Sequence, residues 1–273
     1  MNTSAMSSMY QYRVSRIWQE LDAKGKDKTD LSIDDLLDLD QYHYLGTEAI
    51  AVAAKLMNLD ACSLVLDIGS GVGGTARYLA EKYGCEVTAL ELQDHLHAAA
   101  VNLTQGCGLE AKVKCQAGDI LEFLATQTYD AWISLLVFLH IGDRPSLFNK
   151  SAQVLKPGGK FYIEDYFARH SLSKNDLNIL NNVVACPYLP SRGRYLTDLT
   201  AAGFVDLEFE EVTNLWQPWV KGRFDQFVSE RDQYLSLHGA EMVNAQTSFY
   251  QAIASLFQAG NVGGARIWGR LPA

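Results

Sequence analysis

The chain has 273 residues, of which 48% are hydrophobic and 20% charged, and its formal net charge is −9. These values are typical of a globular protein with room for one large α/β domain and an appended segment. The negative charge and the lack of a Lys/Arg run argue against a nucleic-acid-binding protein. No stretch reaches the roughly 20 apolar residues of a membrane span, so we expect no membrane partner.

The amino terminus and the cysteines favour a reducing, cytoplasmic location. Residues 1–9 lack the basic start and apolar core of a secretory signal. The five cysteines are odd in number, and no pair has CxxC spacing. We therefore expect free thiols and no metal site.

The elements follow one another in a pattern that changes near residue 60. Residues 9–39 carry apolar side chains at helical spacing on both sides of a polar break at 24–30, and residues 47–59 predict a further helix. From residue 63 strands and helices alternate. The strands are predicted at 63–68, 85–90, 111–117, 130–135, 159–166, 204–211 and 263–270. The helices are predicted at 73–84, 93–105, 144–155 and 193–202.

This alternation predicts right-handed βαβ units and an α/β fold. We expect a Rossmann-like, mostly parallel seven-stranded sheet with helices on both faces. The stretches 167–191 and 220–259 interrupt the alternation and are predicted to form a lid. The expected organisation is an N-terminal helical lid (1–60), a Rossmann-like core (61–166), and a substrate lid that also completes the sheet (167–273).

A glycine-rich turn follows the first predicted strand. The run 65–68 leads into Gly-Ser-Gly-Val-Gly-Gly at 69–74, and a helical pattern follows at once. Glycine permits a tight turn and a close approach of the backbone to a ligand, and the N–H groups of the helix start face that ligand. A nicotinamide or flavin enzyme uses a similar turn, so the turn by itself leaves both readings open.

Further residues accompany this turn in a fixed order. Asp67 lies two residues before the first glycine, and Glu91 follows the next predicted strand. Gly118-Asp119-Ile120 and the stretch Leu-Lys-Pro-Gly-Gly-Lys at 155–160 come further along. A nicotinamide enzyme would also place an acid near Glu91, but it would not explain the last two stretches. The ordered set resembles the class I S-adenosylmethionine-dependent methyltransferases.

That resemblance implies roles for the residues of the set. The turn at Gly69, Gly71 and Gly73 would accommodate the amino-acid end of the cofactor, and Asp67 would bind its ammonium group. Glu91 would accept hydrogen bonds from the two ribose hydroxyls. The adenine would be held by Leu92, Asp119 and Ile120.

Four more stretches point to a narrower group. Residues 39–46, 137–141, 195–204 and 264–270 are similar to those of sarcosine/dimethylglycine and phosphoethanolamine N-methyltransferases. This resemblance implies that Gln41, Tyr42 and His43 close over the methionine end of the cofactor. It also places His140 at the reacting centre, and His140 and Tyr42 are the candidate catalytic residues.

Methyl transfer from a sulfonium requires a collinear approach and a nucleophile with a free lone pair. An amine acceptor must first lose a proton, and a neutral histidine suits that task, so His140 is the candidate base. A purely structural histidine at a strand end is the alternative.

The acceptor itself would be held by aromatic and basic side chains. Aromatic faces attract alkylated ammonium groups, and arginine matches carboxylates and phosphates, although core packing and solvation would account for the same residues. The candidate substrate-binding residues are Tyr44, Tyr188, Arg192, Arg194 and Trp219.

The resulting hypothesis is N-methylation of a small amine or amino acid, with S-adenosylhomocysteine as the product and no metal. One alternative is S-methylation of a methylthio-carboxylate, or O- or C-methylation of a small acceptor, on the same fold. A second is a non-catalytic cofactor-binding scaffold. The expected partner is a small-molecule acceptor, and the expected state is a monomer or homodimer.

Overall fold

The computed structural model describes residues 3–273, with side chains from residue 12 onward. Its centre is a seven-stranded sheet with the order β3-β2-β1-β4-β5-β7-β6. Neighbouring strands are parallel except for β7, which is antiparallel to both β5 and β6. The strands are β1 (Leu64–Ile68), β2 (Glu86–Glu91), β3 (Val113–Ala117), β4 (Tyr129–Leu135), β5 (Leu155–Ala168), β6 (Val205–Glu211) and β7 (Val262–Arg270). The predicted mostly parallel, Rossmann-like sheet is confirmed.

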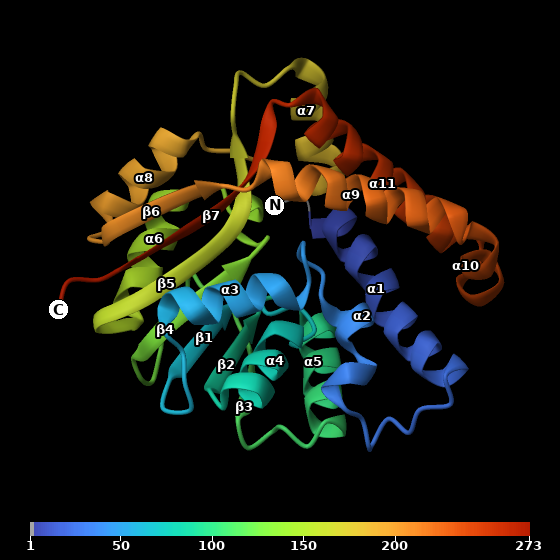
Figure 1. The fold of residues 1–273 in the computed structure, drawn as a ribbon, viewed down its shortest axis with the longest axis horizontal. Coiled ribbons are helices and arrows are strands. Elements are labelled where there is room, and N and C mark those ends of the chain that lie inside the picture. The colour runs from blue at the N-terminus through green and yellow to red at the C-terminus, as the bar shows by residue number, and fades with distance from the viewer. Residues whose placement is uncertain (1–2) are drawn as a thin grey trace.

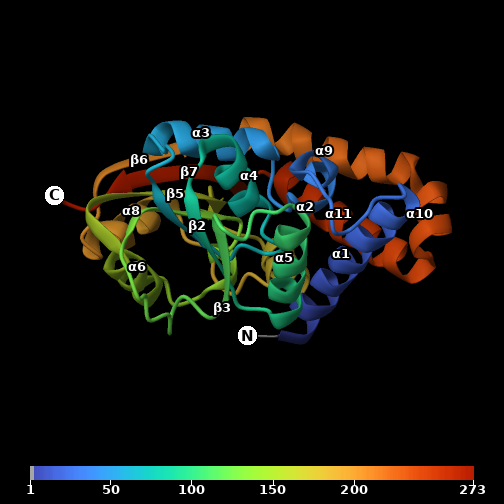
Figure 2. The same ribbon diagram turned by 90° about the horizontal axis from the view of Figure 1, so that it is seen from below.

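Helices cover both faces of this sheet (Figure 1). α3 (Thr47–Met57) and α4 (Gly74–Tyr83) share one apolar core with the strands. α6 (Arg144–Gln153) and α8 (Arg192–Ala201) pack on the opposite side, where Trp132 and Phe161 of the sheet are fully buried. α5 (Asp94–Gly106) packs against β2 and β3. Figure 2 shows α3 and α4 on one side of the sheet and α6 on the other.

The N-terminal region differs in detail from the predicted helices. α1 (Thr3–Ala23) is long, but residues 31–40 form only a 3₁₀ turn (Ile33–Asp35) and one turn of α-helix, α2 (Leu37–Asp40). Leu31, Leu36 and Leu39 are nevertheless buried, in a core shared with α1 and α5. The N–H of Leu31 donates to the carbonyl of Gly106 in α5. Tertiary contacts therefore hold this segment down, and no continuous helix is needed to bury its leucines.

The two stretches that interrupt the alternation form a helical layer above the carboxyl ends of the strands. It comprises α7 (Lys174–Ile179), a π-helical turn (Leu180–Val184), α9 (Thr213–Ser229), α10 (Arg231–His238) and α11 (Ala240–Ala259). α9 and α11 lie side by side at the upper right of Figure 1. The helical stretch begins at Thr213 and not at 220, because β6 ends at Glu211 and α9 follows directly.

A glycine in β7 explains how closely α9 packs against the sheet. A Cβ at Gly264 in β7 would collide with the ring of Trp216 in α9. Trp216 is fully buried and packs against Tyr44 and Phe257. Glycine at position 264 therefore leaves the space that the Trp216 ring of α9 occupies.

Among the described residues, no helix is both long and apolar enough to span a membrane.

Candidate active site

A cavity opens at the carboxyl ends of β1, β2 and β4, which is where ligands bind in sheets of this type. The glycine turn and the segment after β2 form one side. The loop after β4 and the residues around 42–44 form the other. Arg223 of α9 and Phe249 of α11 reach the cavity from the helical layer. The predicted residues that line it are Tyr42, His43, Tyr44, Asp67, Gly69, Gly71, Glu91, Leu92, Asp119, Ile120 and His140.

The glycine turn needs glycine for its backbone angles and for its proximity to the opposite loop. Gly69 has φ 74° and Gly71 has φ 56°, and both lie in the left-handed region. A Cβ at Gly69 would also collide with Val137. The N–H groups of Gly69 and Ser70 both donate to the carbonyl of Leu90, which joins the turn to the end of β2.

Asp67 is a buried acid with unused hydrogen-bonding capacity. It is 2% exposed, and its Oδ2 has no hydrogen-bond partner among the described residues. Burial and, to a smaller extent, the charge of the neighbouring Glu91 together raise the pKa of Asp67 to about 8. A buried oxygen without a partner is costly, so this position suits a ligand group that donates hydrogen bonds. A cationic ammonium group fits that requirement.

Glu91 is held by the backbone around it. Its Oε2 accepts from the N–H of Gly71 at 2.9 Å, and its Oε1 accepts from the N–H of Gln93 at 2.8 Å. Burial raises the pKa of Glu91 to about 6, although these N–H groups favour the ionised form. The carboxylate is thus fixed at the cavity wall, in position to accept from a pair of hydroxyls.

Two apolar side chains contribute to the cavity lining beside the 118–121 turn. They are Leu92 and Ile120, and Leu92 is 47% exposed. The Oδ1 of Asp119 accepts from the N–H of Leu121 at 2.9 Å, and the N–H of Gly118 donates to the carbonyl of Glu91. These bonds hold the 118–121 turn beside β2.

Tyr42, His43 and Tyr44 cover the cavity from the N-terminal region. The Tyr42 hydroxyl is buried with no hydrogen-bond partner among the described residues. The hydroxyl of Tyr44 instead contacts that of Tyr166. Gln41 and Gly73 do not line the cavity, contrary to the expectation that they touch a cofactor. The side chain of Gln41 contacts Asp40 and His43, and Gly73 forms the N-cap of α4.

His140 lies in a 3₁₀ turn (Phe138–His140) directly after β4. Its Nδ1 is 3.1 Å from the carbonyl of Ala185. Burial lowers the pKa of His140 to about 4, so the ring is neutral at pH 7. In the neutral ring this contact makes Nδ1 the donor and Nε2 the acceptor. An imidazole with an acceptor nitrogen is what a general base requires.

Two arginines that the sequence patterns did not single out also line the cavity. The Arg223 guanidinium lies over the rings of Tyr44, Trp219 and Tyr250, at 5.1, 4.6 and 4.5 Å from their centroids. Its Nε is buried without a hydrogen-bond partner among the described residues. Arg13 of α1 lies 4.6 Å from the centroid of Tyr42. No local signal distinguishes these arginines from surface residues of amphipathic helices.

Three of the predicted substrate-binding residues lie elsewhere. Arg194 pairs with Asp198 along α8, and Arg192 lies over the ring of Phe209. Tyr188 is 40% exposed, and none of the three lines the cavity. α8 covers the face of the sheet, so its first turn does not reach the cavity. Trp219 does not line the cavity either, but it packs beneath Arg223.

Comparison with known proteins identifies the class of this fold. Residues 66–163 match the family described as "Methyltransferase domain". A phosphoethanolamine N-methyltransferase structure from Haemonchus contortus superposes with a TM-score of 0.79 at 22% identity, covering 89% of this chain and 61% of that one. A putative sarcosine dimethylglycine methyltransferase from Galdieria sulphuraria gives a TM-score of 0.73 at 21% identity, covering 82% and 84%. The chain therefore carries a methyltransferase domain at residues 66–163, and it shares the fold of this class of enzyme.

Sequence relatives narrow the group within this class. The glycine/sarcosine/dimethylglycine N-methyltransferase of Actinopolyspora halophila is 32% identical over 210 residues, which is 77% of this chain and 36% of that protein. Phosphoethanolamine N-methyltransferase 1 of Zea mays is 30% identical over 203 residues, covering 70% and 38%. The chain spans less than two fifths of the length of these two relatives. It is similar to small-amine N-methyltransferases.

Proposed function

We propose that this protein transfers the methyl group of S-adenosylmethionine to the nitrogen of a small amine that also carries an anionic group. The observation that carries the proposal is the arrangement of one cavity. Asp67, Glu91, His140 and Arg223 all line it. The names of the relatives, which refer to glycine derivatives and phosphoethanolamine, support the same acceptor class.

The cofactor half of the cavity fits S-adenosylmethionine group by group. The buried, unpartnered Oδ2 of Asp67 suits the ammonium group, and the fixed carboxylate of Glu91 suits the ribose hydroxyls. Leu92 and Ile120 suit the faces of an adenine ring. When bound, the cofactor supplies the electrophilic methyl group.

The acceptor half supplies a base and a positive charge. Neutral His140 can take a proton from an ammonium acceptor, which frees the nitrogen lone pair for attack on the methyl group. Arg223 lines the cavity and has a buried Nε without a partner among the described residues, so it can bind a carboxylate or phosphate. The rings around Arg223 hold its guanidinium in place, so its side chain loses little further freedom on binding.

The test is release of S-adenosylhomocysteine by the purified protein with S-adenosylmethionine. The acceptor panel contains glycine, sarcosine, dimethylglycine and phosphoethanolamine, together with thioethers, phenols and amines without an anionic group. We expect turnover of an anionic amine, with a mass increase of one to three methyl groups. Turnover confined to a thioether or phenol would overturn the acceptor. Tight cofactor binding without turnover of any acceptor would point to a scaffold.

A further inference from the structure

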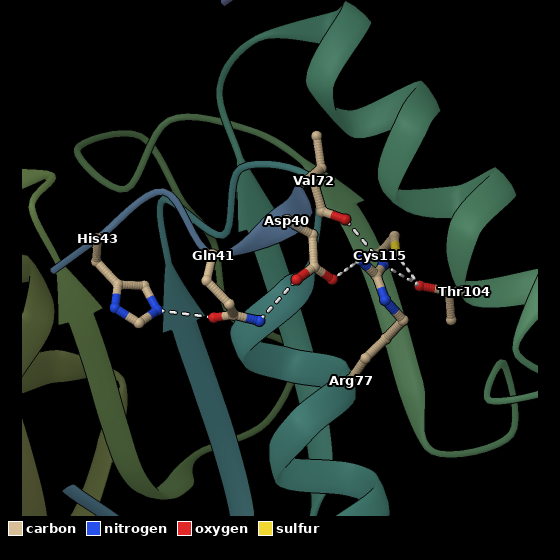
Figure 3. Close-up of polar contacts among 7 residues, drawn as sticks. All are labelled: Asp40, Gln41, His43, Val72, Arg77, Thr104 and Cys115. Atoms are coloured by element: carbon tan, nitrogen blue, oxygen red, sulfur yellow. Dashed lines mark hydrogen bonds and ion pairs between the residues drawn. The ribbon is translucent and has the colours of Figure 1, made fainter. Parts of the chain in front are cut away.

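A buried chain of hydrogen bonds runs from α4 to the cavity wall (Figure 3). Arg77 donates from Nη2 to the Oδ2 of Asp40 at 2.8 Å. The Oδ1 of Asp40 accepts from the Nε2 of Gln41 at 2.8 Å. The Oε1 of Gln41 lies 2.8 Å from the Nε2 of His43, and the Nδ1 of His43 lies 3.2 Å from the carbonyl oxygen of Tyr44.

This hydrogen-bond chain is anchored to the glycine turn and to the start of α4. Arg77 is 1% exposed, and its Nη1 donates to the carbonyl of Val72 in the glycine turn at 2.8 Å. A Cβ at Gly74 would lie 2.7 Å from the backbone oxygen of Asp40 and 2.8 Å from the Nε2 of Gln41. The start of α4 therefore has no side chain where residues 40 and 41 are seated. The Asp40 carboxylate is also favoured by the positive end of that helix.

This hydrogen-bond chain determines which nitrogen of His43 carries the proton. Burial raises the pKa of Asp40, while the ion pair with Arg77 and the hydrogen bond from Gln41 act against that rise. Both oxygens of Asp40 accept from N–H groups, which is the arrangement of an ionised carboxylate. The Gln41 amide must therefore direct its NH₂ group to Asp40 and its oxygen to His43. That oxygen can only accept, so the hydrogen lies on Nε2 of His43. Burial lowers the pKa of His43 to about 4, so the ring is neutral and Nδ1 holds a lone pair.

One contact in this arrangement is left without a hydrogen. Nδ1 of His43 and the carbonyl oxygen of Tyr44 are both acceptors, and they lie 3.2 Å apart. Turning the Gln41 amide over and moving the His43 hydrogen to Nδ1 would satisfy this contact. That change would place the Gln41 oxygen against the Asp40 carboxylate. A hydrogen bond to a charged acceptor is about twice as strong as one between neutral groups. The mismatch therefore stays at His43 and Tyr44, both of which line the cavity.

We propose that His43 Nδ1 and the Tyr44 carbonyl form a subsite for an ammonium group, and that Arg77, Asp40 and Gln41 are positioning residues that keep Nδ1 unprotonated. A ligand N–H donor placed between the two acceptors would satisfy both. The subsite adds a binding contact to the proposed function, and the biological use of the subsite rests on that function. The ammonium group belongs either to the cofactor or to the acceptor, and the binding measurements below separate these sources.

The first test is the tautomer of His43, read by ¹⁵N NMR on ring-labelled protein and assigned with a His43→Gln variant. We expect the Nε2–H form in the unmodified protein. In Asp40→Asn the new amide donates toward Gln41 and turns its side chain over, so His43 should change to the Nδ1–H form. Asp198→Asn is the control, since Asp198 also pairs with an arginine but lies on α8.

Gln41→Met provides a second variant if Asp40→Asn does not fold. It removes the link to Asp40 without leaving a charge unpaired, and His43 should then donate from Nδ1 to Tyr44. An Nδ1–H form in the unmodified protein would overturn the proposal. So would an unchanged tautomer in both folded variants. The His43 tautomer is measured without turnover, so the result of this test is independent of the proposed function.

The second test uses affinity to find the source of the ammonium group. Calorimetry compares S-adenosylhomocysteine with methylthioadenosine, which lacks the amino-acid end. If the subsite holds the cofactor ammonium, Gln41→Met should weaken S-adenosylhomocysteine about tenfold and leave methylthioadenosine unchanged. If it holds the acceptor, both affinities stay the same while the acceptor KM rises about tenfold with kcat retained. No change in any of these values would overturn the subsite.

Discussion

Asp67 and Glu91 lie at the ends of neighbouring parallel strands, and only one of them is satisfied by the backbone. Glu91 accepts from two N–H groups, whereas the Oδ2 of Asp67 has no partner among the described residues. Burial and the charge of Glu91 together raise the pKa of Asp67 to about 8. Of the two acids, Asp67 is therefore the one that holds a proton at neutral pH, and a bound cation would displace that proton.

Cofactor binding should therefore release a proton. Pairing with an ammonium group lowers the pKa of Asp67, so binding near pH 7 should release up to about one proton. Titration calorimetry in buffers of different ionisation enthalpy measures this number. Asp67→Asn should abolish the release and weaken binding at least about tenfold, while Asp232→Asn on α10 should do neither. Equal proton release by Asp67→Asn and the unmodified protein would contradict the assignment.

The same group should make the ligand-free protein less stable as the pH rises. Between pH 4 and 8 the unfolded chain ionises Asp67 while the folded chain keeps it protonated, so the unfolded state binds fewer protons. The contribution to the free energy of unfolding then falls by at most about 1.4 kcal/mol per pH unit. Urea unfolding at several pH values should show a shallower decline for Asp67→Asn. An identical slope would contradict the raised pKa.

Glu91→Gln should be harmful although it keeps the shape of the side chain. Both Glu91 oxygens accept from backbone N–H groups, and an amide NH₂ cannot replace either of them. We expect cofactor affinity to fall at least about tenfold, together with a lower melting temperature. Glu86→Gln is the matched control, because Glu86 is the exposed first residue of the same strand. Unchanged affinity in Glu91→Gln would remove Glu91 from the site.

His140→Ala should lower kcat for an amine acceptor by about 10² or more, with a smaller effect on cofactor affinity. Because burial lowers the pKa of His140 to about 4, kcat should show no inflection from this ring between pH 6 and 8. His170→Ala, at an exposed histidine, should retain full activity. Full activity of His140→Ala would indicate an acceptor that needs no base, such as a thioether.

Arg223→Met should raise KM selectively for anionic acceptors. Methionine keeps the apolar stem between the rings but removes the charge, so a carboxylate or phosphate loses about 1.5–3 kcal/mol of binding. That corresponds to a KM about tenfold or more higher, with little change in cofactor affinity. Arg231→Met on α10, outside the cavity, is the control. An equal KM change for an uncharged acceptor would argue against an anion site.

The positions of the strands and of the residues proposed to hold the cofactor followed from local patterns. A β-branched run before glycines, an acid after the next strand and a regular alternation of elements are all short-range signals, and the parallel topology brings their ends together. Asp67, Gly69 and Glu91 therefore line the cavity, as expected. The same local signals placed the seven strands within a few residues, apart from the earlier start of β5 at Leu155.

The acceptor side was decided only by the tertiary structure. Arg13 and Arg223 lie on α1 and α9, which are far apart in the chain, and no spacing rule joins them. Arg192 and Arg194 look equally suitable in the sequence, yet α8 holds them away from the cavity. The protonation of His43 likewise depends on a buried ion pair whose partners are separated by 37 positions. Long-range packing determines these contacts, and local sequence patterns do not indicate them.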